Sequence, residues 1–444
     1  MGIQLVVTPL GTETTCPQCF ARELVEIAGL RLSAPEVTTI MAEAAEQFHR
    51  LAGTIGSVHE NLERLRSGAI TIRFAHQPNL LPYLGVLGQF THIYLLSAFA
   101  APLSERGAVP AYFVMDYDGG AGRRFVNSLL PDPQARHGAA KLKYRTKGPS
   151  HHRVAFSLEA PPPATLARWS ATFESWAERY SPAVDDERMA DLHHPALAEL
   201  ESARDALQIL GKCYLATDRF AMGNTAFLSV IVNEIWDLPV LFIPLSRCVT
   251  SLQPQMLRIA RHLASVLPES PFQVWKICPV CFSRNATSAV IEDSDDRCVQ
   301  CRSLFDVASL PRPLVGDCIF TRHTPLFFPR VVADDLADYA IYRVPGGTTY
   351  QSSLRHLEQS RPYMPPDRKP GIELGLQFSS SNDKNTGKKS YKNLSGFRAN
   401  EIIRTGRASM LYYLSMFGYS GMKDELLAVS AASMCENHVG GQGQ

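Results

Sequence analysis

Two Cys-x-x-Cys pairs, separated by sixteen residues, constrain the fold of this chain more than any other feature. The pairs are Cys278-Pro-Val-Cys281 and Cys298-Val-Gln-Cys301. Each turn presents two sulfur atoms from one tight loop, and four thiolates suit the tetrahedral coordination of zinc. Because four protein ligands leave no position open, we expect one structural Zn²⁺ ion in a zinc ribbon over residues 274–305. The alternative is a set of four unligated thiols.

A third pair, Cys16-Pro-Gln-Cys19, stands alone. It could be a half-site completed by distant ligands or by a partner chain, a redox pair, or a pair without a role. Ten cysteines in 444 residues are too sparse for a disulfide scaffold, which favours a reducing compartment. No positively charged leader precedes the first apolar run, so we expect a cytoplasmic protein.

Membrane insertion and a globally basic character are not expected. No apolar stretch approaches the roughly 20 residues that span a bilayer, and the best candidate, 227–236, is short and contains a glutamate. The net charge of +1 gives no global electrostatic reason to bind nucleic acid.

Strand and helix patterns alternate from about residue 70. A strand at 71–75, a helix at 84–101 and a strand at 110–115 form a β-α-β unit, which predicts a parallel sheet. A strand at 212–215, a helix near 219–235 and a strand at 239–243 repeat the pattern. We therefore expect an α/β fold with a doubly wound, Rossmann-like parallel sheet, an inserted zinc ribbon and flanking helices.

The N-terminal part of the chain is predicted to form one long amphipathic helix over 34–66, which starts at a capping box. Its heptad seam consists of Val37, Met41, Ala44, Phe48, Leu51, Ile55, Val58, Leu62 and Leu65. The seam could pack on its own domain or form a helical hairpin or a homodimer contact.

The remaining segments complete the expected domain plan. Residues 131–165 are interpreted as a long loop or insertion, 166–207 as helical and 364–396 as a mobile polar loop. The expected units are an N-terminal segment 1–69, a core 70–273 with a helical insertion, the ribbon 274–305, the rest of the catalytic region 306–435 and a disordered tail 436–444.

Candidate ligand-binding residues follow the first expected strand. His76, Gln77 and Asn79 come directly after it and precede a helix. Ligands of parallel sheets bind at the carboxyl ends of strands, and an imidazole, two amides and a helix N-terminus suit phosphate. The alternative is a capped turn with a packed histidine.

Charged residues follow the second strand. Asp116 and Asp118 share one side of an extended chain and could hold an ammonium group or Mg²⁺. Arg123 and Arg124 could pair with phosphate or carboxylate. The alternative is a surface turn whose charges neutralise one another.

Two later segments could approach a nucleotide. The turn at Gly346 and Gly347 lets backbone N–H groups come close to a ligand, and Lys388 and Lys389 follow a serine cluster and could cover a triphosphate. A hairpin turn and a solvated loop are the respective alternatives.

The segment HQPNLLPYLGVLGQFTHIYLL resembles the His-Gln-Pro strand-turn-helix of the bacillithiol-synthesis cysteine-adding enzymes. The Asp-x-Asp segment and the late Gly-Gly segment follow in a similar order. That family has a core similar to class I nucleotidyltransferases and joins cysteine to a sugar-malate acceptor. The resemblance implies a nucleotidyltransferase-type core that acts on an amino acid.

The motif order also resembles class I lysyl-tRNA synthetases, with a cysteine-zinc insert, a glycine segment and a serine-rich loop. This resemblance implies ATP chemistry on an amino acid. The chain departs from both patterns, because His76 has no second histidine three positions on, the Lys-Met-Ser-Lys-Ser loop is not intact, and the cysteine-adding family lacks zinc cysteines.

These features together predict an ATP-dependent ligase that condenses an amino acid with a small-molecule or peptide acceptor, with Zn²⁺, ATP and Mg²⁺ as cofactors. One alternative is a synthetase-like or RNA-binding protein with transfer RNA as partner. Its candidate basic surface consists of Lys141, Lys143, Arg145, Lys147, Arg153, Lys384, Lys388, Lys389 and Lys392. The other alternative is a scaffold without chemistry.

Overall fold

The computed structural model describes the chain in segments. These are residues 6–8, 35–116, 125–135, 138–145, 153–180, 197–248, 251, 273–278, 280–287, 297–298, 300–303, 319–320, 325–326, 339–342, 372–377, 399, 402–403 and 406–435.

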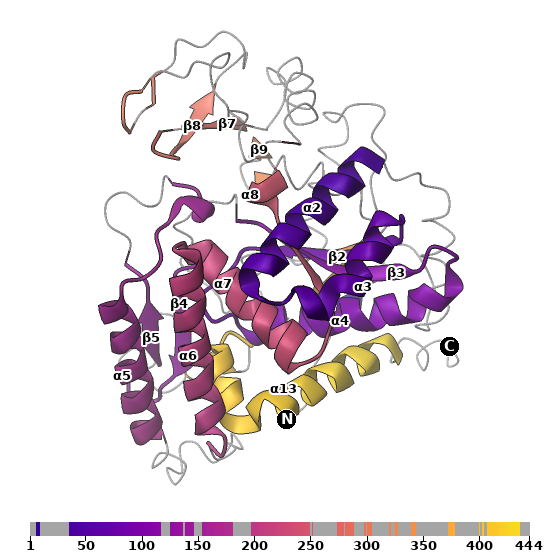
Figure 1. Ribbon diagram of the computed structural model, residues 1–444. Helices are drawn as coiled ribbons and strands as arrows, with labels where there is room; N and C mark the ends of the chain where they lie inside the picture. The colour runs from indigo at the N-terminus through magenta and orange to yellow at the C-terminus, as the bar shows by residue number, and fades with distance from the viewer. Residues whose placement is uncertain are drawn as a thin grey trace.

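A six-stranded sheet with the order β1-β12-β11-β2-β3-β6 forms the centre of the fold (Figure 1). Its strands are β1 (Val6–Thr8), β2 (Ile70–His76), β3 (Ala108–Val114), β6 (Leu241–Pro244), β11 (Tyr339–Tyr342) and β12 (Ile372–Gln377). The five strands from β12 to β6 run parallel, and β1 is antiparallel at the edge. The α/β class with a parallel sheet is therefore confirmed.

The order of the parallel strands reverses at the middle of the sheet. If the five parallel strands are numbered by their order in the sequence, the sheet reads 3-2-1-4-5 from β6 to β12. The chain adds β3 and β6 on one side of β2 and then β11 and β12 on the other, so the strand order reverses between β2 and β11. The cysteine module lies between β6 and β11 in the sequence, so this sheet takes strands from both sides of it. Ligands of open α/β sheets bind at such reversal points, outside the carboxyl ends of the strands.

Helix α4 (Leu84–Ala100) is mostly apolar and mostly buried, as expected of a helix in the core of a fold. It packs against β2, β3 and the C-terminal helix α13 (Met410–Cys435), which runs beside it in Figure 1. Aromatic packing holds it to the sheet: the Phe90 ring meets the Phe74 ring edge-on, with 4.9 Å between centroids. The buried stretch Leu84–Leu103 is long and apolar enough to cross a membrane, so the expectation that no stretch reaches this length was wrong. With 72% of its candidate window buried, this stretch is a core helix of the fold.

The predicted long N-terminal helix is two helices, α2 (Pro35–Ala52) and α3 (Ile55–Arg66). The break lies at Gly53, whose φ of 75° is readily adopted only by glycine. The seam residues Phe48, Val58 and Leu62 are buried within the same chain, which fits a seam that packs on its own domain. Leu51 of the same seam is 39% exposed, and the homodimer contact stays a prediction.

Helix α2 also closes an edge of the sheet. The backbone N–H of Phe242 in edge strand β6 donates to Nε2 of His49, at 2.9 Å. The His49 ring lies 2.7 Å from Thr54 Oγ1 through its other nitrogen, and Thr54 Oγ1 lies 2.8 Å from Ser229 Oγ. An exposed strand edge invites pairing with other chains, and this buried network satisfies it internally.

The region between β3 and β6 differs from the sequence expectation in two places. The expected loop 131–165 contains strand β5 (Ala139–Lys143), which forms a hairpin with β4 (Asn127–Pro131), the strand that ends where the expected loop begins. The expected strand 212–215 lies instead in helix α6 (Leu200–Thr217). Cys213 and Tyr214 of this run are buried in that helix, whereas Leu215 is exposed. Periodicity alone does not separate a short strand from such a segment.

The other elements that precede β3, lie between β3 and β6 or directly follow β6 are mainly helical. They are η1 (Ala101–Leu103), η3 (Ala155–Ser157), α5 (Pro163–Tyr180), α7 (Phe220–Ser229), the π-helical turn Val230–Ile235 and α8 (Leu245–Cys248). Helices α5, α6 and α7 and the β4–β5 hairpin lie together on the left of Figure 1.

The cysteine module forms its own antiparallel sheet with the order β10-β9-β7-β8. Its strands are β7 (Gln273–Ile277), β8 (Arg284–Thr287), β9 (Ile319–Phe320) and β10 (Pro325–Leu326). Further along, β12 falls inside the segment 364–396 that was expected to be a mobile loop, so that expectation was wrong for residues 372–377.

Candidate functional site

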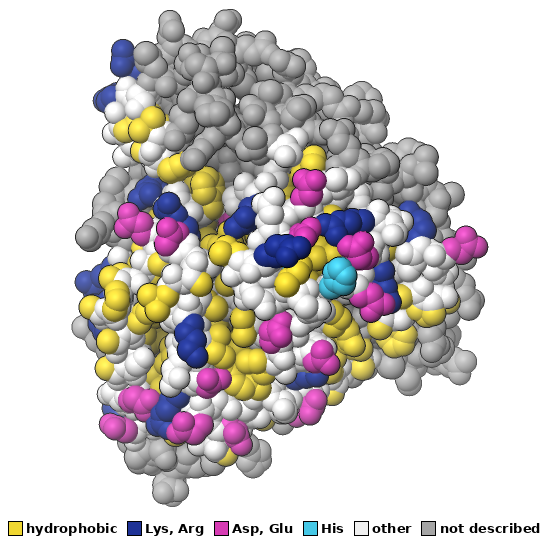
Figure 2. Space-filling view, viewed as in Figure 1, with side chains coloured by type: hydrophobic (Ala, Val, Ile, Leu, Met, Phe, Trp, Pro, Cys, Tyr) yellow, Lys and Arg dark blue, Asp and Glu magenta, His cyan; other side chains and the backbone are white. Residues whose placement is uncertain are grey.

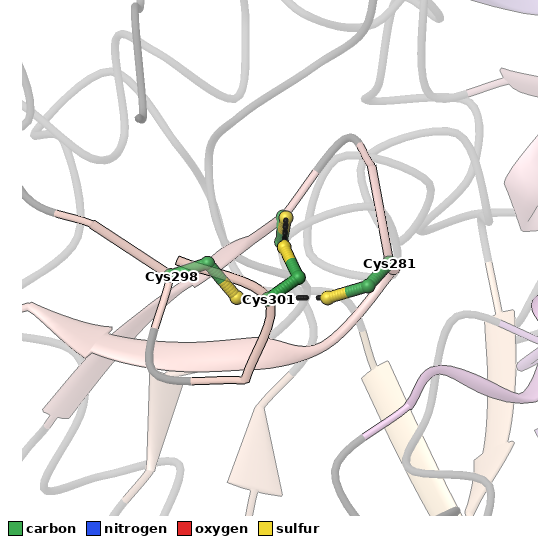
Figure 3. Close-up of side chains that lie close together, drawn as sticks. Cys281, Cys298 and Cys301 are labelled. Carbon is green, nitrogen blue, oxygen red and sulfur yellow. Dashed lines mark hydrogen bonds between the residues drawn. The ribbon is translucent and has the colours of Figure 1, made fainter. Parts of the chain in front are cut away.

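The four cysteines of the two pairs converge on one point. Their sulfur atoms all lie within 4.8 Å of one another, with 3.6 Å between those of Cys278 and Cys301 and 3.5 Å between those of Cys281 and Cys298. Figure 3 shows the sulfur atoms of Cys281, Cys298 and Cys301 turned toward a shared centre. A tetrahedral zinc ion with Zn–S bonds of ~2.3 Å places sulfur atoms about 3.8 Å apart. The geometry therefore suits one metal ion such as zinc and is too wide for disulfides.

The two cysteine turns share one backbone pattern. The N–H of Cys278 donates to the carbonyl of Ser283, and the N–H of Phe282 donates back to the carbonyl of Cys278, both at 2.8 Å. In the second turn the N–H of Cys298 donates to the carbonyl of Ser303 at 2.8 Å, and the N–H of Arg302 donates to the carbonyl of Cys298 at 2.9 Å. Phe282 and Arg302 carry φ values of 59° and 62°, which let each turn fold back around its sulfur atoms.

The local chemistry also favours a bound metal. Burial raises the pKa of the Cys278 thiol, so a thiolate there needs a compensating cation. The Ser303 hydroxyl, 3.2 Å from Cys301 Sγ, lowers the pKa of Cys301 to about 6. Four cysteine ligands leave no position open for substrate, so the metal would be structural.

The first cysteine turn docks on the segment that follows β5. The N–H of Val154 donates to the carbonyl of Phe282 at 3.1 Å, and Arg153 forms an antiparallel bridge with Ser283. The Phe282 ring also packs against Phe156. These contacts fasten the cysteine module to the segment 153–157.

Strand β2 ends at His76, one residue beyond the expected strand 71–75, and Gln77 and Asn79 lie in the turn that follows. The Nδ1 atom of His76 lies 2.9 Å from the carbonyl oxygen of Gln77, which favours a proton on Nδ1 and leaves Nε2 as an acceptor. That Nε2 lies 3.4 Å from the hydroxyl of Tyr83. From β3, the Tyr112 hydroxyl donates to the carbonyl of His76 at 3.0 Å.

A second layer of side chains supports this turn. Asn224 of α7 donates to the carbonyl of Pro78 at 2.9 Å and accepts a short hydrogen bond from Tyr214 of α6. Leu81 carries a φ of 42°, and its carbonyl accepts a hydrogen bond from Ser128 at 2.9 Å. A leucine in the left-handed region costs on the order of 1–3 kcal/mol, and such strain is concentrated at ligand sites.

Asp116 follows β3 and is 1% exposed. Its Oδ1 accepts the backbone N–H of Ser246 at 2.9 Å, and its Oδ2 accepts a short hydrogen bond from the Ser246 hydroxyl. Burial raises the pKa of Asp116 to about 6, although both hydrogen bonds from Ser246 lower it. Burial and the charge of Asp116 raise the pKa of Tyr112, which places its hydroxyl in the same electrostatic cluster.

The strand ends therefore bring together residues from β2, β3 and the short helix after β6. The N–H of Met115 donates to the carbonyl of His76 at 2.9 Å, and Asp116 is bound by Ser246 of α8. The sequence analysis did not single out Ser246, Arg247 or Asn224. Ser246 and Arg247 come three and four residues after the expected strand 239–243, and this position was a signal for them, whereas Asn224 lies mid-helix and gave none.

Several predicted residues lie outside the described segments. They are Asp118, Arg123, Arg124, Gly346, Gly347, Lys388 and Lys389, together with Cys16 and Cys19. Their proposed roles stay predictions.

A small cavity of about 10 Å³ lies away from the strand ends. It is lined by Thr38, Met41, Leu65, Gly68, Ala69, Thr71, Phe113 and Ile243. Its volume holds at most one water molecule, so it is a packing void.

Comparison with known proteins gives no family for the chain. No family model matches it, and no curated protein is similar to it.

Proposed function

We propose that the chain is an ATP-dependent ligase that condenses an amino acid with a small-molecule or peptide acceptor, in a specialised biosynthetic pathway in the cytoplasm. The observation that carries the proposal is the grouping of His76, Gln77, Asn79 and Asp116 at the carboxyl ends of β2 and β3, next to the point where the strand order reverses. The order is that of doubly wound nucleotide-binding sheets, which supports a Rossmann-like core of nucleotidyltransferase type.

Each residue has a role in this proposal. His76 and Gln77 contact the phosphate or polarise the activated carboxyl group, and Asn79 supports nucleotide binding. Asp116 and Asp118 hold the amino group or Mg²⁺, and Arg123, Arg124, Lys388 and Lys389 contact the triphosphate. The Gly346-Gly347 turn approaches the nucleotide, and zinc holds the cysteine module.

Nucleotide consumption by the zinc-loaded chain tests the proposal. AMP and ADP are measured separately in the presence of each of the twenty amino acids, alone and with pooled amine acceptors. AMP with pyrophosphate, dependent on one amino acid, indicates an adenylating ligase, and ADP with phosphate indicates an acyl-phosphate ligase. Neither product under any condition contradicts the proposal and favours a scaffold.

An RNA-binding protein of synthetase-like type is the second candidate. Its support is the outer surface of the cysteine turns, where Val280 is 64% exposed and Gln300, Arg297 and Arg302 are also exposed. On the face shown in Figure 2, however, basic and acidic side chains are interspersed, so described residues form no continuous basic surface there. Transfer RNA binding that weakens steeply with salt would favour this candidate.

A further inference from the structure

Arg247 lies at the strand-end site, and none of the charged residues that the structure describes forms an ion pair with it. It belongs to α8, which begins where β6 ends, and it directly follows the Ser246 that binds Asp116. Its side chain is half-buried, and burial lowers the pKa of its guanidinium group.

The protein gives this cation little compensation. Among the described residues no carboxylate forms an ion pair with Arg247. Arg50, Arg64, Arg66, Arg179, Arg204 and Arg219, by contrast, each contact a carboxylate directly. Its Nε atom is buried without a hydrogen-bond partner in the same residues. Within the described segments its NH1 donates to the amide oxygen of Gln47 on α2, at the long distance of 3.5 Å.

Asp116 acts on Arg247 through space and not by contact. The two groups attract each other electrostatically, but both carboxylate oxygens of Asp116 are bound to Ser246. Among the described residues no hydrogen bond or ion pair joins the Asp116 carboxylate to the guanidinium group, which therefore keeps donors to spare there. A desolvated cation without a partner costs free energy, and chains keep such groups where a ligand supplies the missing anion.

We infer that Arg247 is an additional anion-binding residue of this site and takes a phosphate or carboxylate group of the ligand in a bidentate contact. The inference rests on the proposed function for the location of the site, and it adds a residue that holds the anion at the end of β6. A planar guanidinium group presents paired N–H donors that match both anions.

Gln47 provides a sharp test of this inference. Replacement Gln47→Glu places a carboxylate at the position of the amide oxygen that Arg247 already reaches. The new ion pair should raise the unfolding midpoint slightly and, at the same time, weaken anion binding, because the protein now supplies the partner. If Arg247 had only a structural role, Gln47→Glu would raise the unfolding midpoint without weakening anion binding.

The experiment is calorimetric titration of the zinc-loaded full chain with pyrophosphate, ATP and acetate. We expect Arg247→Gln to weaken binding of the recognised anion by roughly ten- to a hundred-fold, and Arg247→Lys and Gln47→Glu to weaken it less. The control Arg50→Gln removes the same charge from an arginine on α2 that is paired with Glu46 and should leave binding unchanged. Pyrophosphate and ATP responses identify a phosphate site, and an acetate response identifies a carboxylate site.

Two binding results overturn the inference: no anion binding by the wild-type chain, or wild-type affinity in folded Arg247→Gln, Arg247→Lys and Gln47→Glu. Failure of the proposed function is distinguishable from both. Anion binding that depends on Arg247 without any AMP or ADP formation would overturn the ligase and leave the anion site. Nucleotide consumption that is unchanged in all three variants would do the reverse.

Discussion

The ring of Phe282, in the first cysteine turn, lies edge-on to the ring of Phe156, with 5.5 Å between their centroids. The N–H of Phe156 in turn donates to the carbonyl of Asp116 at 2.8 Å. A single side-chain contact thus links the cysteine module to the end of β3. We therefore expect that loss of the metal, which would disorder the cysteine turns, also increases the mobility of the backbone at Asp116.

Zinc removal should therefore loosen the site as well as the module. We expect one zinc ion per chain by elemental analysis and less than half of that in Cys281→Ser. Hydrogen exchange of the Val154 and Phe156 amides should accelerate in this variant, whereas that of α5 should not. Cys213→Ser replaces a buried thiol outside the cluster and should keep both zinc and protection. Full zinc content in Cys281→Ser would contradict the four-cysteine centre.

Buried histidines should make the fold sensitive to acid. Burial lowers the pKa of His49 and of His92 to about 3, from an ordinary value near 6.5. Between these values the unfolded chain binds more protons than the folded chain, so stability falls as pH falls through this window, by up to about 1.4 kcal/mol per pH unit for each histidine. Urea unfolding from pH 8 to pH 4 measures this slope. His92→Leu should reduce it, and His59→Gln on the exposed face of α3 should not.

Asp116 should act in its ionised form. Its pKa is raised to about 6, so activity or cation binding that needs the carboxylate should be lost as pH falls through about 6. Asp116→Asn keeps the shape of the side chain but not the charge, and should abolish this pH dependence together with most of the activity. Asp132→Asn is the control, because Asp132 is a buried carboxylate paired with Arg179 on another element. An unchanged pH profile in Asp116→Asn would remove Asp116 from the mechanism.

His76 should contribute to turnover more than to folding. If it acts as a general acid or base, His76→Ala should lower kcat by roughly 10²–10⁴. Tyr83→Phe removes the hydroxyl near Nε2 and should have a smaller effect. Steady-state kinetics at saturating nucleotide measure both, and wild-type turnover in His76→Ala would exclude a catalytic role.

Gly223 should be needed for the close contact between α7 and α6. A Cβ atom there would lie 2.2 Å from Cδ1 of the Tyr214 ring, which must then move and release Asn224 from the turn after β2. We expect Gly223→Ala to cost about 1–3 kcal/mol in unfolding free energy and to weaken ligand binding. Gly211→Ala, whose Cβ would make an ordinary 3.7 Å contact with Leu166, should be neutral or stabilise α6. Equal stability of the two variants would show that Tyr214 moves freely.

The accuracy of the sequence analysis follows from how local each signal was. The strand that ends at His76 and the strand that ends shortly before Asp116 were both predicted, because a buried parallel strand is a short apolar run bounded by polar residues. The cysteine cluster was predicted because its spacing alone determines the ligand set. These features depend on neighbouring residues only.

Features that depend on tertiary context were missed. The run at Cys213 and Tyr214 has the composition of a strand, and only its packing in α6 shows that it is helical. The seam through Phe48 and Leu62 has heptad spacing whether it meets another chain or its own sheet. Nothing in the sequence distinguishes Arg247 from other basic residues. Only the structure shows that Asp116 is hydrogen-bonded to Ser246 and that no described carboxylate forms an ion pair with Arg247.

The position of β2 at the middle of the sheet has a consequence for how the chain reaches its native state. Ile72 pairs on one side with Pro110, after a short connection, and on the other with Tyr339, after most of the chain has been made. Closing so long a loop costs more entropy and slows folding. We expect a nascent chain to assemble β2, α4 and β3 early. The other edge of β2 then stays unpaired until β11 has been synthesised, and we expect the need for a chaperone to be greatest during that time.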